Sequence, residues 1–184
     1  MSQGKFTTLS QRNRPGVVTQ RIDCTYNPDE KGLMQAIADI VAEAESAVRA
    51  GTSILILSDR GIEKERLPIH SLLSAGAVHH HLIAQGLRID ANIVVETASA
   101  RDSHQIACLL GFGATAVYPY MAYSVLEDLI RSGEVLGEPS ACYKNYRKGI
   151  NKGLLKIMSK MGISAVSSYR GAQLFEAVGL AREV

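Results

Sequence analysis

Two short polar segments follow apolar runs of strand length in this sequence, at residues 58–60 and 96–99. The carboxyl ends of parallel strands meet at one edge of a sheet, and ligands of parallel α/β folds bind at that edge. These side chains are therefore candidates for ligand contact or for an interdomain surface. The competing interpretation is loop capping and ion pairing, for example between Asp59 or Glu96 and a nearby arginine. The candidate residues are Ser58, Asp59, Arg60, Glu96, Ser99, His104 and Lys160.

The histidines do not form the pattern of a metal site. His79, His80 and His81 are consecutive, and neighbours on a helix point about 100° apart, so they cannot all bind one ion. A structural zinc ion needs a closed set of four ligands, and His70 and His104 lie elsewhere in the chain. We expect at least one histidine to be a buried, hydrogen-bonded packing residue, and we expect no metal site.

The cysteines and the glycine pair also lack the context that chemistry would require. Cys108 lies among apolar residues, where burial makes a thiol unreactive. With Cys24 and Cys142 it makes an odd, widely separated set, which argues against a disulfide framework and favours a reducing cytosol. Gly111 and Gly113 precede a predicted strand rather than a helix, so they do not match a dinucleotide-binding fingerprint.

Lysines recur at four-residue intervals near the carboxyl end, at Lys144, Lys148, Lys152, Lys156 and Lys160. On a helix they form a slowly drifting cationic stripe. We favour a solvated helical face, and the alternative is contact with acidic or phosphate groups of a neighbouring domain or partner. Nucleic-acid binding is the least favoured, because the nearby aromatic residues lie on one side only.

Two glycines lie within the same predicted helix. Gly149 and Gly153 each cost roughly 1 kcal/mol of helix propensity relative to Ala. The close approach of another backbone explains such glycines best. Gly162 fits the carboxyl-terminal cap of this helix.

Hydrophobic periodicity and turn residues predict alternating helices and strands. We expect helices near residues 30–51, 69–85, 103–110, 124–132, 145–161 and 171–179, and strands at 53–58, 92–96, 114–118 and 163–168. A charged loop is expected at 59–68 and a linker at 134–141. Residues 1–29 are polar and carry turn signals, so we expect an extended, partly disordered amino-terminal arm.

This alternation indicates an α/β fold with a parallel sheet and right-handed crossovers. The pattern fits an incomplete (β/α)-barrel-like domain or an open doubly wound sheet and does not decide between them. The chain has 184 residues and a net charge of +2, which allows a sizeable core and gives no reason to expect nucleic-acid or membrane binding. No signal-peptide or membrane-spanning segment is recognisable, so we expect a cytoplasmic protein.

Several long motifs resemble the large (alpha) subunit of glutamate synthase, most strongly its bacterial NADPH-dependent type. The resemblance is carried by KGLLKIMSKMGIS (152–164) and SYRGAQLFEAVGL (168–180), and upstream by ILSDR (56–60), GAVH (76–79), ANIVVETASARD (91–102) and LGFGATAVYPY (110–120). It covers roughly residues 30–184. One position departs: the family usually has Thr where this chain has Ala165, which removes one candidate hydrogen bond.

The resemblance implies that residues 30–184 are the carboxyl-terminal part of the central domain, ending at the junction with the FMN-binding synthase domain. The family converts glutamine, 2-oxoglutarate and NADPH into two glutamates, in ammonia assimilation and glutamate biosynthesis. Its central domain connects the two reaction centres and helps to form the ammonia path. We therefore expect this chain to be a piece of a larger oxidoreductase, without catalytic, cofactor-binding or metal-binding residues of its own.

The resemblance also implies cofactors and partners. The family uses FMN and a three-iron iron–sulfur cluster in the large subunit, and FAD and NADPH through the small subunit. This chain begins Met1-Ser2 and has no run of cluster-ligating cysteines, so it matches neither the family's amino-terminal cysteine nucleophile nor its cluster. The expected partners are the glutamine amidotransferase domain, the FMN-binding synthase domain and the small subunit, with no nucleic acid and no membrane.

Two alternatives of other classes remain at this point. The chain is a free-standing small α/β enzyme if Asp59, Glu96 and His104 converge on one pocket within hydrogen-bond reach. It is a non-catalytic interaction or scaffold protein if exposed apolar faces dock other subunits.

Overall fold

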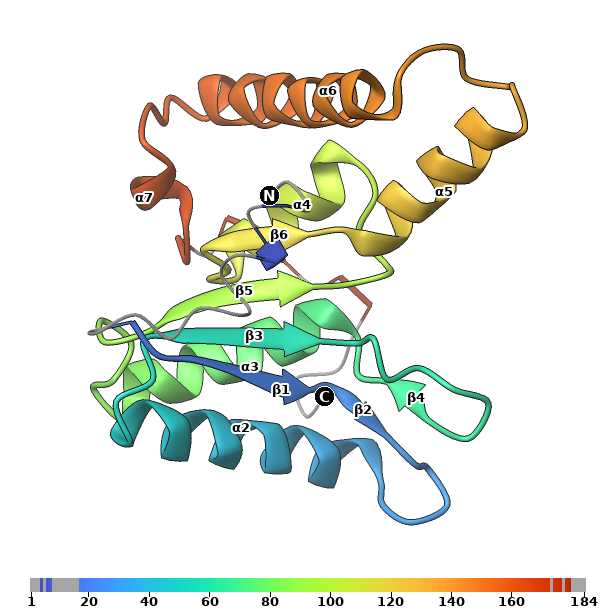
Figure 1. Ribbon diagram of the computed structural model, residues 1–184. Coiled ribbons are helices and arrows are strands. Elements are labelled where there is room, and N and C mark those ends of the chain that lie inside the picture. The colour runs from blue at the N-terminus through green and yellow to red at the C-terminus, as the bar shows by residue number, and fades with distance from the viewer. Residues whose placement is uncertain (1–3, 5, 8–16, 173, 177, 180–184) are drawn as a thin grey trace.

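A four-stranded parallel sheet forms the centre of the molecule (Figure 1). The structure is a computed structural model that describes residues 4, 6–7, 17–172, 174–176 and 178–179. Its strand order is β1-β3-β5-β6, with β1 at Thr19–Asp23, β3 at Ile54–Ser58, β5 at Asn92–Glu96 and β6 at Ala116–Tyr118. A separate two-stranded antiparallel pair joins β2 (Thr25–Tyr26) to β4 (Leu67–Pro68).

Helices alternate with these strands along the chain. They are α2 (Leu33–Arg49), α3 (Ser71–Ala84), α4 (Ser103–Gly111), α5 (Tyr120–Arg131), α6 (Pro139–Lys160) and α7 (Val166–Tyr169). Figure 1 shows α6 lying over α4, at the end of the molecule opposite α2. No helix in the described part of the chain is long and apolar enough to span a bilayer.

Both faces of the sheet are buried, which explains why the strands lack alternation in the sequence. On one face Leu55 and Leu57 pack with apolar residues of α2, α3 and α4 in the main core. On the other face Ile56 and Val94 pack with Tyr118 in a second, smaller cluster. Phe6 covers this cluster, with its ring stacked on that of Tyr118 at 4.3 Å between centroids. We call these the helix face and the inner face of the sheet.

The prediction of an amino-terminal arm is wrong for residues 19–26. Thr19–Asp23 is a strand of the sheet and pairs in parallel register with β3, Arg21 opposite Ile56. The sequence hid this strand because Ile22 is its one fully buried residue, while its other positions are polar. The arm's residues 1–3, 5 and 8–16 lie outside the described residues.

The last predicted strand and helix are also wrong. Residues 163–165 form no regular element and Val166–Tyr169 is a short helix. The described residues between 171 and 179 are not helical, and Gly171 and Gly179 have φ of +69° and +89°. Two boundaries shift as well: α5 begins at Tyr120 rather than near 124, and α6 begins at Pro139, within the predicted linker. The other predicted helices and strands are confirmed, whereas the predicted loop at 59–68 ends in strand β4.

Ala165 is the N-cap residue of α7 and supplies no side-chain hydrogen bond. A threonine, which the resemblance implies for this position, carries an oxygen that caps a helix amino terminus. The prediction that Gly162 ends α6 is confirmed by its φ of +70°.

The two glycines of α6 have different environments. A Cβ at Gly153 would lie 2.5 Å from the Ser103 Cβ and closer still to its Oγ. The prediction of a close approach is therefore confirmed at Gly153, where α4 begins. Gly149 is exposed and a Cβ there would meet nothing within 4 Å, so no neighbour in the described part of the chain requires this glycine.

We expect alanine to have opposite effects at these two positions. Gly149→Ala should raise the free energy of unfolding by about 1 kcal/mol through helix propensity. Gly153→Ala should lower it by about 1 kcal/mol, because forcing a methyl group against Ser103 costs more than the propensity gained. Urea unfolding followed by circular dichroism measures both. Equal stabilisation by the two variants would contradict the packing of α6 on α4.

Candidate functional site

The Glu96 carboxylate at the carboxyl end of β5 joins three neighbouring strands. Glu96 is 1% exposed. One oxygen accepts a hydrogen bond from Ser58 Oγ of β3 at 2.7 Å and lies 3.1 Å from Arg21 Nη1 of β1. The other accepts from Arg60 Nε at 2.5 Å. Every charge-compensating contact that a buried carboxylate requires is thus present. We call Arg21, Ser58, Arg60 and Glu96 the edge cluster.

Both arginines of the edge cluster are half exposed, at 45% of each side chain. The Arg60 guanidinium lies over the Tyr120 ring, 4.2 Å from its centroid. Burial lowers the pKa of Arg60, but its hydrogen bond and charge interaction with Glu96 outweigh this and leave the pKa raised. Burial also raises the pKa of Tyr120, as does the neighbouring Asp59 carboxylate. The tyrosine therefore stays a neutral phenol beneath the cation.

A chain of hydroxyl groups starts at Asp59, the residue after β3. Asp59 is buried and accepts hydrogen bonds from Ala98 N at 3.0 Å and from Thr97 Oγ1 at 2.7 Å. The chain continues from Thr97 to Ser99 and from Ser99 to Ser71, with 3.0 Å between the oxygens at each step. Asp59 is therefore bound tightly to the loop that follows β5.

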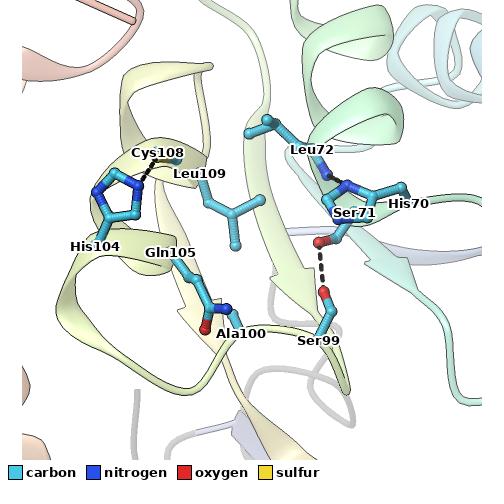
Figure 2. Close-up of a pocket in the computed structure, with 9 residues that line it drawn as sticks. All are labelled: His70, Ser71, Leu72, Ser99, Ala100, His104, Gln105, Cys108 and Leu109. Carbon is cyan, nitrogen blue, oxygen red and sulfur yellow. Dashed lines mark hydrogen bonds between the residues drawn. The ribbon is translucent and has the colours of Figure 1, made fainter. Parts of the chain in front are cut away.

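The far end of this chain reaches a small pocket, and Figure 2 shows Ser71 and Ser99 joined by a hydrogen bond in its lining. Its volume is about 160 Å³, and it lies between the amino-terminal ends of α3 and α4. It is lined by His70, Ser71, Leu72, Ser99, Ala100, His104, Gln105, Cys108 and Leu109. His104 Nε2 lies 3.7 Å from Cys108 Sγ. Burial raises the pKa of the Cys108 thiol, so the thiol is protonated and a poor nucleophile at neutral pH.

The structure brings together some of the predicted site residues and separates others. Ser58, Asp59, Arg60, Glu96 and Ser99 all lie at the carboxyl edge of the sheet. His104 lines the pocket, but neither Asp59 nor Glu96 does. Lys160 is exposed at the end of α6, away from this edge. Sequence reasoning missed Arg21, because its segment was expected to be an arm.

No group of three or more His, Cys, Asp or Glu side chains in the described residues could hold a metal ion. The three consecutive histidines point to different neighbours. His79 is buried, His80 is exposed, and His81 Nε2 lies 2.5 Å from Glu45 Oε2. The expectation that one of them is a buried, hydrogen-bonded packing residue is confirmed by His79.

His79 lies at the amino edge of the sheet, opposite the edge cluster. Its Nδ1 accepts a hydrogen bond from Arg88 Nε at 2.8 Å, and Arg88 also donates to the carbonyl oxygens of Ala91 and Gly113. Burial and the positive charge of Arg88 lower the pKa of His79 to about 4. On its other side, a Cβ at Gly171 would lie 2.9 Å from His79 Nε2, so glycine allows the segment after α7 to approach the ring.

This arrangement predicts a loss of stability on mild acidification. Below pH 6.5 the unfolded chain protonates His79, whereas the folded chain resists protonation down to about pH 4. The stabilisation is complete above pH 6.5 and is lost as the pH falls towards 4. Between pH 7 and pH 5 the loss should be about 2 kcal/mol.

The variant His79→Asn keeps an acceptor for Arg88 and removes this titration, so its unfolding free energy should depend less on pH. The control is His70→Asn at an exposed histidine at the other end of α3, which should keep the full dependence. Denaturant unfolding at pH 5, 6 and 7 measures it. If the unfolding free energy depends equally on pH in the wild type and in both variants, His79 is not the group responsible for the loss of stability.

The edge cluster predicts that Glu96→Gln is costly. The substitution keeps the shape but removes the charge that two arginines and a hydroxyl group share, and hydrogen bonds to charged groups contribute about 1.5–3 kcal/mol. We expect a loss of about 2 kcal/mol in the free energy of unfolding. Glu65→Gln, at an exposed position, is the matched control and should change stability little. A similar small effect of both substitutions in urea unfolding would show that the cluster is not structural.

Comparison with solved structures supports the fold. The chain is similar to a mutant flavocytochrome b2 with pyruvate bound (TM-score 0.54, 14% identity, covering 74% of this chain and 35% of that one). It is also similar to a mandelate oxidase mutant with a monooxide FMN adduct (TM-score 0.52, 17% identity, covering 71% and 37%). At such identities the likeness concerns the fold alone. It agrees with the predicted incomplete (β/α)-barrel-like arrangement of parallel strands and helices.

Comparison of sequences identifies the family. The family model described as the glutamate synthase central domain matches residues 1–181. The chain is 41% identical over 184 residues to the NADPH glutamate synthase large chain of Bacillus subtilis, covering 100% of this chain and 12% of that protein. It is 44% identical over 187 residues to the NADH glutamate synthase of Schizosaccharomyces pombe, covering 98% and 9%. The chain thus spans only a small part of these relatives, and it belongs to the glutamate synthase central domain family.

Proposed function

We propose that this chain acts as the connecting part of a glutamate synthase, in ammonia assimilation in the cytoplasm, and that it contains neither reaction centre. The family match supports this role. The observation that carries it is the edge cluster. At the edge where parallel α/β enzymes bind ligands, the buried carboxylates of Glu96 and Asp59 already have partners within the chain. They position structure and are not available as an acid–base pair.

The reaction explains why a rigid connector is needed. A glutamate synthase releases the amide nitrogen of glutamine as ammonia at one centre and adds it to 2-oxoglutarate at another. Loss of water leaves an imine, which takes up a hydride (two electrons and a proton) supplied ultimately by NADPH and a second proton from solvent, and two glutamates result. Ammonia that escapes into water is largely protonated at neutral pH and loses the lone pair that makes an amine a nucleophile. A connector must therefore hold the two centres at fixed geometry and keep the ammonia path closed to solvent.

The fold suits this role physically. The carboxyl edge is held by ion pairs and hydrogen bonds across β1, β3 and β5. The two faces of the sheet are filled by separate apolar clusters. Motion of one strand relative to the next would break several contacts at once. The exposed sides of Arg21 and Arg60 are the surfaces of the edge cluster that a neighbouring domain can touch.

We assign no flavin to the described residues. In the edge cluster, the side chains that would hold a flavin phosphate are paired with Glu96, and the inner face beside them is covered by Phe6 stacked on Tyr118. In the proposed assembly, FMN and the iron–sulfur cluster belong to other parts of the large subunit. FAD and NADPH belong to the small subunit, and the partners are that subunit and the other large-subunit domains.

The alternative of a free-standing enzyme required Asp59, Glu96 and His104 to converge on one pocket. His104 lines the pocket between α3 and α4, whereas the two carboxylates bind other groups. This separation favours the connector over an enzyme. The scaffold alternative also describes a non-catalytic protein that binds other subunits. It differs from the connector only in that those subunits would not belong to a glutamate synthase.

A domain replacement tests the proposal. The matching segment of the Bacillus subtilis large chain is replaced by this chain, and glutamine consumed and glutamate formed are measured together with NADPH oxidation. We expect the chimera to form two glutamates for each glutamine and each NADPH consumed. The isolated 184-residue chain should neither hydrolyse glutamine nor acquire a flavin spectrum with FMN.

Ammonia-dependent glutamate formation serves as the control, because it bypasses transfer between the centres. A chimera that uses added ammonia but hydrolyses glutamine without forming glutamate would argue against a connecting role. A stoichiometric yellow complex of the isolated chain with FMN would overturn the statement that it lacks a reaction centre.

A further inference from the structure

The segment that contains α6 and α7 has an unusual charge. Between residues 139 and 175 the chain carries seven Lys and Arg residues and no Asp or Glu, although its overall net charge is only +2. The rest of the chain is therefore net acidic. The positive charge of the molecule is concentrated on one helical segment.

The five lysines of α6 are unpaired. All of them are exposed, and none forms an ion pair with any described residue. Several other surface cations do have partners, as with Lys31 and Asp39, or Arg66 and Asp23. Like charges four residues apart destabilise a helix. Repulsion between these lysines therefore lowers the stability of α6, and no acidic residue in the described chain offsets it.

Gly149 lies on the same face. The positions 148, 149, 152 and 156 fall on one side of an α-helix at 100° per residue, and all four are exposed. Gly149 lies at the margin of this side, one turn before Gly153, which contacts α4. A glycine there lowers helix propensity, and it leaves open space where a side chain would stand. The unpaired lysines would attract an acidic segment. The missing side chain at Gly149 would let the backbone of that segment lie close to α6.

An apolar groove borders this face. Its volume is about 230 Å³, and it is lined by Leu110, Asn151, Leu154, Leu155, Met158, Val166 and Tyr169. Leu155 and Val166 are 64% and 48% exposed. The Tyr169 hydroxyl group is buried and has no hydrogen-bond partner among the described residues. The surface thus offers apolar contact next to positive charge.

We propose that the outer face of α6 is a docking surface for an acidic α-helix of another domain of the same polypeptide. Lysines four residues apart recur every 6 Å along a helix, since the rise is about 1.5 Å per residue. Asp or Glu residues at the same interval on a facing helix match them, and Gly149 lets the two backbones approach. The partner follows from the proposed function, because the relatives contain several times more chain than this one.

A nucleic acid fits this surface less well. The aromatic residues of α6, Tyr143 and Tyr146, face inward, each with its ring 5.5 Å from that of Tyr123. They cannot serve as a platform for stacking bases. The net acidic remainder of the molecule would also repel a long polyanion.

The test measures binding of three labelled probes to the 184-residue chain by fluorescence anisotropy at low and at physiological salt. The probes are a helical 22-residue peptide with Glu at every fourth position, the same peptide with Gln in place of Glu, and a single-stranded oligonucleotide of equal charge. We expect the Glu peptide to bind best and to weaken as salt rises. The triple variant Lys148→Glu, Lys152→Glu, Lys156→Glu should weaken its binding about tenfold or more.

Two variants separate docking from folding. Gly149→Gln should weaken binding of the Glu peptide several-fold while the thermal midpoint stays the same or rises, which a folding defect cannot do. Lys64→Glu changes an exposed charge in the loop between β3 and β4, away from α6, and should bind the peptide nearly as the wild type does. Equal binding of the Glu and Gln peptides, tighter binding of the oligonucleotide, or no binding at all would overturn the proposal. If the Glu peptide binds but the chimera is inactive, the docking surface on α6 is supported and the proposed connecting role is refuted.

Discussion

The arrangement of this molecule depends on one buried carboxylate that three strands share. An isolated charge in an apolar interior is very unfavourable, and a carboxylate is tolerated there only when it is paired and hydrogen-bonded. Glu96 meets that condition through Arg21, Ser58 and Arg60, which come from β1, from β3 and from the residues just after β3. The pairing therefore fixes the order of the strands as well as the shape of their carboxyl edge. The same pairing leaves the carboxylate of Glu96 unavailable to bind a substrate or to transfer a proton.

Much of the fold was predictable, because its signals are local. The strands β3, β5 and β6 are short apolar runs, and α2, α3 and α4 repeat apolar residues with helical spacing. The strand β1 could not be recognised, since Ile22 is its one fully buried side chain and its Arg21 has meaning only beside Glu96. The opposite error occurred at residues 163–168. Ile163 and Val166 favour extended structure locally, but a strand needs a neighbour to bond, and this segment follows α6, which packs on α4 rather than beside the sheet.

The candidate site, like the fold, was predictable from the sequence in part only. Strand ends in a parallel sheet share an edge, so the approximate position of Ser58, Asp59, Arg60 and Glu96 follows from the sequence. Which of them pair depends on the register that sets Ser58 beside Glu96, and the sequence does not contain that register. The hydroxyl chain from Asp59 to Ser71 depends further on where α3 begins. The two glycines of α6 looked alike in sequence, and only packing shows that Ser103 explains Gly153 and leaves Gly149 unexplained.

The position of β1 at the outer side of the sheet sets a limit on how far the chain can be shortened. Deleting residues up to 24 would remove Arg21 from Glu96 and would leave the apolar strand β3 with free backbone donors and acceptors along one side. Unprotected strands of that kind recruit strands from other molecules and lead to aggregation. A trimmed version intended for crystallisation or spectroscopy therefore has to begin before Thr19, however dispensable the polar amino-terminal sequence looks.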